Sequence, residues 1–134
     1  MQKDYKIWHG KKSLINDLET RPSFHERDIW FCYMGLNVGF EQDGSGNDFM
    51  RPVIIIKKFN NEVFWAIPLT KVKYSKKKWP AQYYYEFSFI ENVKSAAVLS
   101  QIKLVDAKRL ARQIGIMPQN QFLEIIEKLK ALLP

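Results

Sequence analysis

The chain has 134 residues, of which 46% are hydrophobic and 26% charged, and this balance indicates one globular domain and excludes a disordered or fibrous protein. The single cysteine, Cys32, excludes an internal disulfide, and without a secretory signal or an apolar run of about 20 residues the sequence predicts a cytoplasmic protein. Lysine and arginine outnumber acidic residues by 21 to 14, and the net charge of +7 favours a polyanionic partner, RNA or DNA before an acidic protein.

The N-terminal part of the chain combines a helical pattern with a first strand. Apolar residues recur at roughly helical spacing within residues 4–19 and a proline follows, so we expect an N-terminal helical extension over residues 1–27. Residues 28–35 are rich in aromatic and other β-prone side chains and indicate a strand. The glycines and polar residues of 37–52 then predict a long exposed loop.

A β-hairpin is the next predicted unit. Residues 53–59 form an apolar run typical of a buried strand, and the Asn60-Asn61 pair predicts a tight turn. Residues 62–69 return as the partner strand. Five lysines without an acidic residue occupy 71–78 and separate this hairpin from the later strands.

The last third of the chain predicts two more strands and a helix. The strands are expected over 83–91 and 95–106, with a short helical turn at 106–115 and a terminal helix that starts at Pro118. No helix of adequate length separates consecutive strands, which argues against a doubly wound parallel sheet. We therefore expect a mainly β (α+β) fold over residues 28–134, a small antiparallel barrel with a C-terminal helix.

Several catalytic chemistries find no support in the sequence. It contains no Gly-rich phosphate loop of the common types and no G-x-S-x-G nucleophile motif. His9 and His25 lack a second ligand at metal-binding spacing, and a ribonuclease that uses them as acid and base stays open as an alternative. Cys32 lies within a predicted strand, where we expect a buried, inert thiol. The polar residues that remain on loops and strand ends are Glu41, Gln42, Arg51, Thr70 and Gln101.

These residues belong to a series of short motifs. The string NVGFEQDGSGNDFMRPVIII comes first, WAIPLT follows the hairpin, and LSQIKLVDAKRL comes later. In this order the motifs resemble the MazF/PemK family of bacterial toxins, from about Asp28 to the C-terminus. The resemblance implies an SH3-like barrel, usually dimeric, with the activity of a sequence-selective, metal-independent endoribonuclease of a toxin–antitoxin pair that needs no cofactor.

The same resemblance implies roles for individual residues. Arg51 matches the family's catalytic arginine, and Thr70 matches its catalytic threonine. Glu41 is a further catalytic candidate. The other residues that the motifs place at the RNA groove are Gln42, Gln101 and Lys103.

RNA supplies its own nucleophile, the 2′-hydroxyl, so its cleavage needs neither a Ser or Cys triad nor a metal-bound water. We expect Arg51 to stabilise the negative charge that builds on the phosphate and Thr70 to donate a hydrogen bond to the same phosphate. Glu41 either takes the 2′-proton or orients Arg51. The expected products are a 2′,3′-cyclic phosphate, or a 3′-phosphate, and a 5′-hydroxyl.

The lysine-rich segment is expected to bind single-stranded RNA, because aromatic rings stack on bases while ammonium groups contact phosphates. The residues predicted to do so are Lys71, Lys73, Tyr74, Lys76, Lys77, Lys78 and Trp79. The other aromatic residues are expected in the core or at a dimer surface. They are Trp8, Trp30, Trp65, Tyr83, Tyr84 and Tyr85.

An acidic antitoxin that fills the RNA groove is the expected protein partner, and no membrane association is expected. Two other readings stay open: a non-catalytic module that binds nucleic acid, and a protein-interaction domain built on the same barrel. The presence of both Arg51 and Thr70 favours the ribonuclease over these two.

Overall fold

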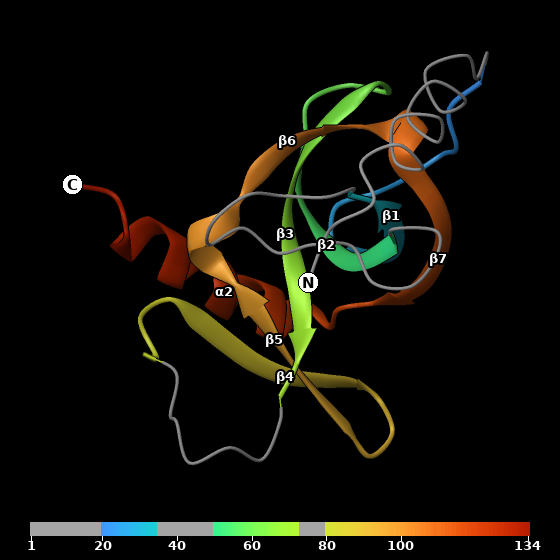
Figure 1. Cartoon of the computed structure of the whole chain (residues 1–134). Coiled ribbons are helices and arrows are strands. Elements are labelled where there is room, and N and C mark those ends of the chain that lie inside the picture. Colours follow the sequence, from blue (N-terminus) through green and yellow to red (C-terminus); the bar gives the residue numbers. More distant parts are fainter. Residues whose placement is uncertain (1–19, 35–49, 73–79) are drawn as a thin grey trace, which may run out of the picture.

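The computed structural model of the chain describes residues 20–34, 50–72 and 80–134, which form a curled antiparallel sheet with one helix packed against it (Figure 1). The strands are β1 (Asp28–Tyr33), β2 (Met50–Lys58), β3 (Val63–Lys71), β4 (Tyr84–Ile90), β5 (Val93–Val98), β6 (Lys103–Asp106) and β7 (Leu110–Ile116). The 3₁₀ turns η1 (Leu99–Gln101) and η2 (Ala107–Arg109) flank β6, and the helix α2 spans Gln119–Ala131. The helix predicted within residues 4–19 lies outside the described residues.

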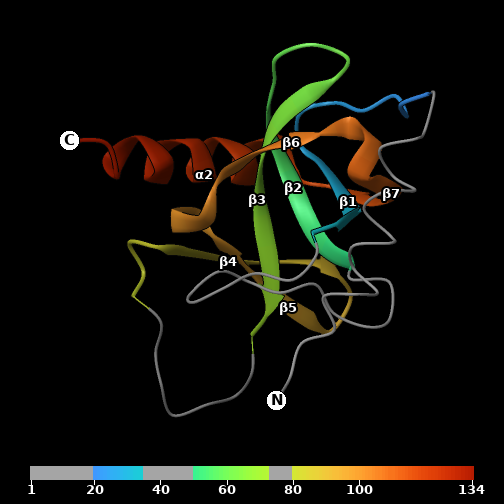
Figure 2. The same ribbon diagram turned by 45° about the horizontal axis from the view of Figure 1, so that its top comes forward.

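Strand β3 is the centre of the sheet. Its residues 63–66 pair with β6 and its residues 69–71 pair with β5, as Figure 2 shows by the positions of these strands along β3. Pro68, which has no N–H to donate, lies between the two paired stretches. On its other edge β3 pairs with β2, and the order continues through β1 to β7. The change of partner curls the sheet into a small barrel-like shape, and the expected mainly β, antiparallel fold is confirmed.

The apolar run of β2 contributes to two hydrophobic cores, because successive side chains of a strand point to opposite faces. Ile54 and Ile56 belong to the first core, and Val53 and Ile55 belong to the second. The first core also contains Ile29, Ile67, Leu69, Tyr85, Phe87, Leu99 and Ile125. The second also contains Phe24, Trp30, Cys32, Phe64, Ala66, Val105 and Leu110. Burial of each large apolar side chain stabilises the fold by about 1.5–3 kcal/mol. Strand β2 therefore stabilises both cores.

The stretch 95–106, predicted as one strand, is divided into β5 and β6. The turn η1 separates them, and its Leu99 is fully buried in the first core. The two strands pair with different stretches of β3, so the chain has to change direction between them. The interruption follows from the curl of the sheet, which local strand propensity does not encode.

The helical turn predicted at 106–115 is wrong beyond the three residues of η2. From Leu110 the chain forms β7, which pairs with β1. Leu110 lies opposite Cys32 and is buried in the second core, while Arg112 lies over the ring of Phe31 at 4.9 Å. Ala, Arg and Gln favour helices when nothing else decides, but here pairing and burial outweigh that preference.

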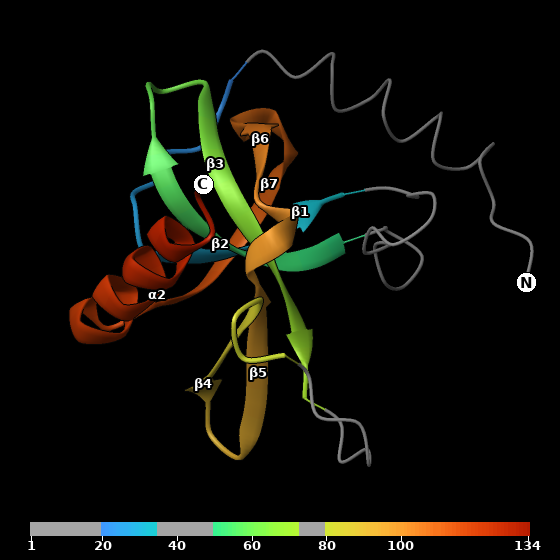
Figure 3. The same ribbon diagram turned by 90° about the vertical axis from the view of Figure 1, so that its left-hand side faces the viewer.

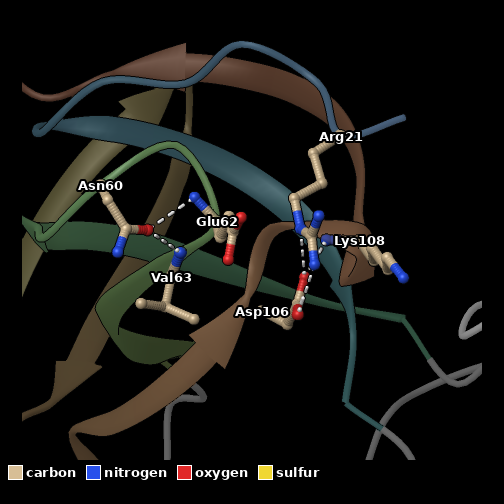
Figure 4. A network of polar contacts seen from close by, with 6 residues as sticks. All are labelled: Arg21, Asn60, Glu62, Val63, Asp106 and Lys108. Atoms are coloured by element: carbon tan, nitrogen blue, oxygen red, sulfur yellow. Dashed lines mark hydrogen bonds and ion pairs between the residues drawn. The ribbon is translucent and has the colours of Figure 1, made fainter. Parts of the chain in front are cut away.

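Residues 20–27 run along the barrel and are fastened to it. The ring of Phe24 is fully buried, with its centre 4.9 Å from that of Phe64. The guanidinium of Arg21 donates two hydrogen bonds, of 3.0 and 3.2 Å, to the carboxylate of Asp106 at the end of β6 (Figure 4). These contacts place the last part of the predicted N-terminal extension on the barrel itself.

Helix α2 covers the first core along one side of the sheet (Figure 3). It begins after Pro118, whose extended backbone makes it the N-terminal cap rather than the first helical residue. Ile125 is fully buried, the hydroxyl of Tyr85 donates a hydrogen bond to Glu124, and the ammonium of Lys128 donates one to the Ala81 carbonyl. Within the described parts of the chain, no helix has the length and apolar character needed to cross a membrane.

Candidate active site

Arg51 and Thr70 lie on the neighbouring strands β2 and β3. Val53 pairs with Pro68, and Arg51 and Thr70 each lie two residues further toward the same end of these two strands. One terminal nitrogen of Arg51, Nη2, donates a 3.1 Å hydrogen bond to the carbonyl oxygen of Leu69. The guanidinium is therefore held beside the residue that precedes Thr70, and both side chains are half-buried.

The neighbours of this pair are small and buried. Arg51 pairs with Cys32 on β1, and Thr70 pairs with Ala96 on β5. Cys32 and Ala96 are both fully buried. Burial raises the pKa of the Cys32 thiol to about 12, against smaller effects of positive charge from Arg109 and Lys103. The thiol is therefore protonated at neutral pH, and the expectation of a buried cysteine is confirmed.

Lys103 lies on the same face as Arg51, whereas Lys71 does not share the face of Thr70. Lys103 pairs with Ala66, a member of the second core, and its charge acts on the Cys32 thiol in that core. Lys71 follows Thr70 directly on β3 and is exposed, so its side chain projects to the opposite face. Gln101 ends η1, two residues before β6 begins at Lys103, and is half-buried.

The other predicted site residues lie outside the described part of the chain. They are Glu41, Gln42, Lys73, Tyr74, Lys76, Lys77, Lys78 and Trp79. The strand ends that border the undescribed segments nevertheless lie at the same end of the sheet. Tyr33 ends β1 opposite Met50, where β2 begins next to Arg51, and β3 ends directly after Thr70.

Arg109 is a residue of this region that the sequence did not single out. It ends η2, and its Nη1 donates a 3.1 Å hydrogen bond to the carbonyl oxygen of Tyr33 at the end of β1. The one signal for it was its place in the string LSQIKLVDAKRL, where it was assigned to a helical turn.

The buried carboxylate of Asp28 has a structural role. Its oxygens accept hydrogen bonds from the His25 backbone N–H, the indole Nε1 of Trp30 and the amide of Gln113, at 2.8, 3.3 and 3.1 Å. Three donors satisfy a buried carboxylate and keep it in place. Within residues 20–34, 50–72 and 80–134, no three His, Cys, Asp or Glu side chains are grouped so that they could hold a metal ion.

Some of the remaining aromatic residues line an apolar groove. Its volume is about 750 Å³, and it lies between α2, η1 and the β2–β3 hairpin. Its apolar lining includes Ile56, Phe59, Trp65, Tyr83, Leu99, Ile102, Ile126, Leu129, Leu132 and Leu133, and Lys57 and Lys130 also line it. Trp65 is 44% exposed and packs edge-to-face on Phe59, whereas Trp30 is buried in the second core.

Comparisons with known proteins agree on one family and one fold. Residues 26–133 match the PemK-like, MazF-like toxins of type II toxin–antitoxin systems. MazF of Deinococcus radiodurans is 16% identical with a TM-score of 0.60, over 85% of this chain and 97% of its own. The MazF-mt6 toxin of Mycobacterium tuberculosis is 17% identical with a TM-score of 0.56, over 78% and 94%. The MazE–MazF complex of D. radiodurans gives 17% and 0.52, over 85% and 96%.

A comparison with curated proteins gives no match. The solved structures show the fold, and the family match extends from β1 through α2. The fold implied by the motifs is thus the fold observed. The chain belongs to the PemK-like, MazF-like toxin family of type II toxin–antitoxin systems.

Proposed function

We propose that this protein is an endoribonuclease toxin that cleaves single-stranded RNA without a metal ion, through attack of the 2′-hydroxyl on the neighbouring phosphorus. The observation that carries the proposal is the 3.1 Å hydrogen bond from Nη2 of Arg51 to the carbonyl oxygen of Leu69, the residue that precedes Thr70 on the neighbouring strand. Membership of the PemK-like, MazF-like toxin family supports the same assignment, and one solved structure of similar fold is an endoribonuclease in complex with its cognate antitoxin.

The reaction forms a bond between the 2′-oxygen and phosphorus and breaks the bond from phosphorus to the 5′-oxygen. Negative charge builds on the non-bridging oxygens, where the permanently charged, planar guanidinium of Arg51 matches the phosphate. The hydroxyl of Thr70 donates to the same phosphate and fixes its orientation. The 2′-proton passes to a base and the leaving 5′-oxygen is protonated. Glu41 either serves as that base or orients Arg51.

The RNA-binding surface is proposed to extend from this pair in two directions. Lys103 shares the face of Arg51, and Gln101 stands just before it in the chain. The segment that contains Lys73 to Lys78 with Tyr74 and Trp79 follows β3, and the segment with Gln42 precedes β2. Lysines that follow the phosphates and rings that stack on bases suit single-stranded RNA.

An acidic antitoxin is the proposed protein partner. The net charge of +7 favours an acidic binding partner as well as RNA, and the antitoxin is proposed to fill the RNA groove. The similar fold from D. radiodurans was solved in a complex of MazF with MazE. We place the pair in the cytoplasm, where RNA substrate is present.

A homodimer is also proposed, and the apolar groove supports it. The groove and its margin expose Trp65, Phe59, Leu104 and Leu133 at 44%, 46%, 60% and 72%. Contiguous apolar surface of this kind usually marks a protein interface. A second copy of the chain would cover it symmetrically.

The proposed activity is tested with purified protein and a mixed-sequence single-stranded RNA in excess EDTA. Cleavage is expected to proceed in the chelator and to leave a cyclic phosphate, and a 2′-deoxy nucleotide at the cleaved position should abolish cleavage while the RNA is still bound. Loss of activity in EDTA would refute the metal-independent mechanism. Binding without cleavage by the wild-type protein would support the non-catalytic module instead.

A further inference from the structure

Three cationic residues of the described chain are related to the end of β1: Arg51 pairs with Cys32, Arg109 donates a hydrogen bond to the Tyr33 carbonyl, and the charge of Lys103 acts on the Cys32 thiol. Arg51 lies on β2, Lys103 begins β6, and Arg109 ends η2. We call these three residues the cationic rim. Cys32 on β1 pairs with Arg51 on one side and with Leu110, the neighbour of Arg109, on the other. Arg51 and Arg109 therefore lie beside the end of β1, one on the side of β2 and the other next to the start of β7.

The position of Arg109 is fixed by its hydrogen bond to the backbone. Its Nη1 donates to the Tyr33 carbonyl at 3.1 Å, and Tyr33 pairs with Met50, the residue before Arg51. This bond orients the planar guanidinium. Arg109 therefore contacts the strand pair Tyr33–Met50, which is adjacent to the pair that contains the proposed catalytic Arg51. Arg109 is half-buried.

The charges of Arg109 and Lys103 act on the same buried atom. Burial dominates and raises the pKa of the Cys32 thiol, whereas Arg109 and then Lys103 lower it. Lys103 pairs with Ala66, which belongs to the same core as Cys32, and Arg109 donates a hydrogen bond to Tyr33, the residue that follows Cys32.

We propose that Arg109 binds a phosphate of the RNA strand next to the phosphate that is cleaved. The proposal rests on the proposed ribonuclease function and adds a residue to its substrate-binding surface. A guanidinium held in a fixed orientation pairs with phosphate in two-point geometry and loses little freedom when it does so. Arg51 then acts on the reacting phosphate, while Arg109, with Lys103, holds the neighbouring part of the backbone.

The neighbouring Lys108 provides a matched control. It belongs to the same 3₁₀ turn and carries the same charge, but its charge acts on the carboxylate of Asp106, on the side of the turn that Figure 4 shows. Arg109→Gln therefore removes a positive charge next to the proposed site. Lys108→Gln removes one from the adjacent position, on the side of Asp106.

The test measures binding to a mixed-sequence pool of single-stranded 2′-fluoro RNA, which keeps the phosphates but has no nucleophile. The dissociation constant is followed between about 50 and about 200 mM salt, where each phosphate contact contributes about 0.7 to the slope of log K against log salt. Arg109→Gln is expected to weaken binding about tenfold at the low-salt end and to reduce the slope by about 0.7. Lys108→Gln should leave the slope unchanged, and Arg109→Lys, which keeps the charge, should restore it.

A purely structural role for Arg109 would lower the Tm and leave the salt slope at the wild-type value, and that result would overturn the inference. If Arg109→Gln does not fold, Arg109→Met, which keeps the packing of the aliphatic stem, is measured in its place with the same expectation. If Arg109→Gln shows the wild-type salt slope and cleaves RNA normally, Arg109 does not bind a phosphate, and the proposed ribonuclease function is unaffected. A wild-type protein that neither binds the pool nor cleaves RNA would overturn both.

Discussion

A guanidinium and a hydroxyl on adjacent strands are the smallest unit of the proposed mechanism. Arg51 donates a hydrogen bond to the carbonyl of Leu69, the residue that precedes Thr70 on β3. The two groups differ in what they give to the phosphate. Arginine supplies charge in a planar fork, whereas threonine supplies one directed hydrogen bond.

Arg51→Lys keeps the positive charge and removes the planar, two-point hydrogen-bonding geometry of the guanidinium. We expect kcat/KM for RNA cleavage to fall about 100-fold or more, on the scale of removing one preorganised donor from a reaction site, with the Tm little changed. Cleavage assays on a defined RNA together with thermal melts check this. Activity within twofold of wild type would mean that a point charge at this position suffices.

Thr70→Val keeps the shape of the side chain and removes the hydroxyl, and Thr70→Ser keeps the hydroxyl. Since Thr70 is half-buried at the end of β3, the valine variant is expected to fold and to lose about 10- to 100-fold in kcat. The serine variant should keep most of the activity. Equal rates for the two variants would show that the hydroxyl takes no part.

The sequence predicted some of these residues and missed others for physical reasons. Arg51 and Thr70 stand in short motifs, and their juxtaposition follows once the β2–β3 hairpin is recognised. Arg109 lies in a stretch whose composition favours a helix, so its approach to the end of β1 depends on a pairing between strands about 80 residues apart.

At the scale of elements, the barrel depends on contacts between segments that are distant in the chain. The hairpin β2–β3 was predicted from its apolar runs and its Asn60-Asn61 turn, where the Asn60 side chain accepts hydrogen bonds from two backbone N–H groups. The division of 95–106 by η1 and the strand β7 could not be predicted from local sequence. Both depend on pairing with a strand that is distant in the chain, not on the conformational preferences of their own residues.

The contact between residues 20–27 and β6 has a testable pH dependence. The hydrogen bond from Arg21, more than any other interaction, lowers the pKa of the Asp106 carboxyl, which is 40% exposed. A lowered folded-state pKa means that the pair stabilises the protein above the ordinary carboxyl value near 4, and that this stabilisation is lost as the pH falls through the lowered pKa.

Arg21→Gln is therefore expected to lower the Tm at pH 7 and to match the wild-type Tm once Asp106 is protonated in both proteins. The control is Arg112→Gln, which also removes one charge but whose partner, the ring of Phe31, does not titrate. Melting curves from pH 7 into the acid range compare the two. A Tm difference for Arg21→Gln that does not change with pH would show that the ion pair contributes nothing to stability.

For the whole molecule, two hydrophobic cores and two surface features have separate roles. The cores hold the sheet and α2 together, Arg51 and Arg109 of the cationic rim lie beside the end of β1, and the apolar groove lies between α2 and the β2–β3 hairpin. The overall class was predictable because strands without intervening helices pair as antiparallel neighbours. The closure of the sheet around two cores was not, because it depends on β3 changing partners.

Trp65→Ser tests the groove as the dimer surface. The wild-type protein is expected to sediment as a dimer at micromolar concentration, and the variant should dissociate at least tenfold more easily, because Trp65 is 44% exposed in the single chain. Leu123→Ser, at a residue of α2 that is 55% exposed and does not line the groove, is the control. Sedimentation of wild type as a monomer, or equal behaviour of the two variants, would contradict this interface.

Arg51 and Thr70 are proposed to act on one phosphate, and a double-mutant cycle on RNA cleavage tests this most directly. The rates of wild type, Arg51→Ala, Thr70→Val and the double variant are compared on one RNA in EDTA. Cooperation at one phosphate predicts that the double variant is scarcely slower than the slower single variant. Two losses that simply multiply, with both single variants folded, would show that the two side chains act independently and would contradict the account.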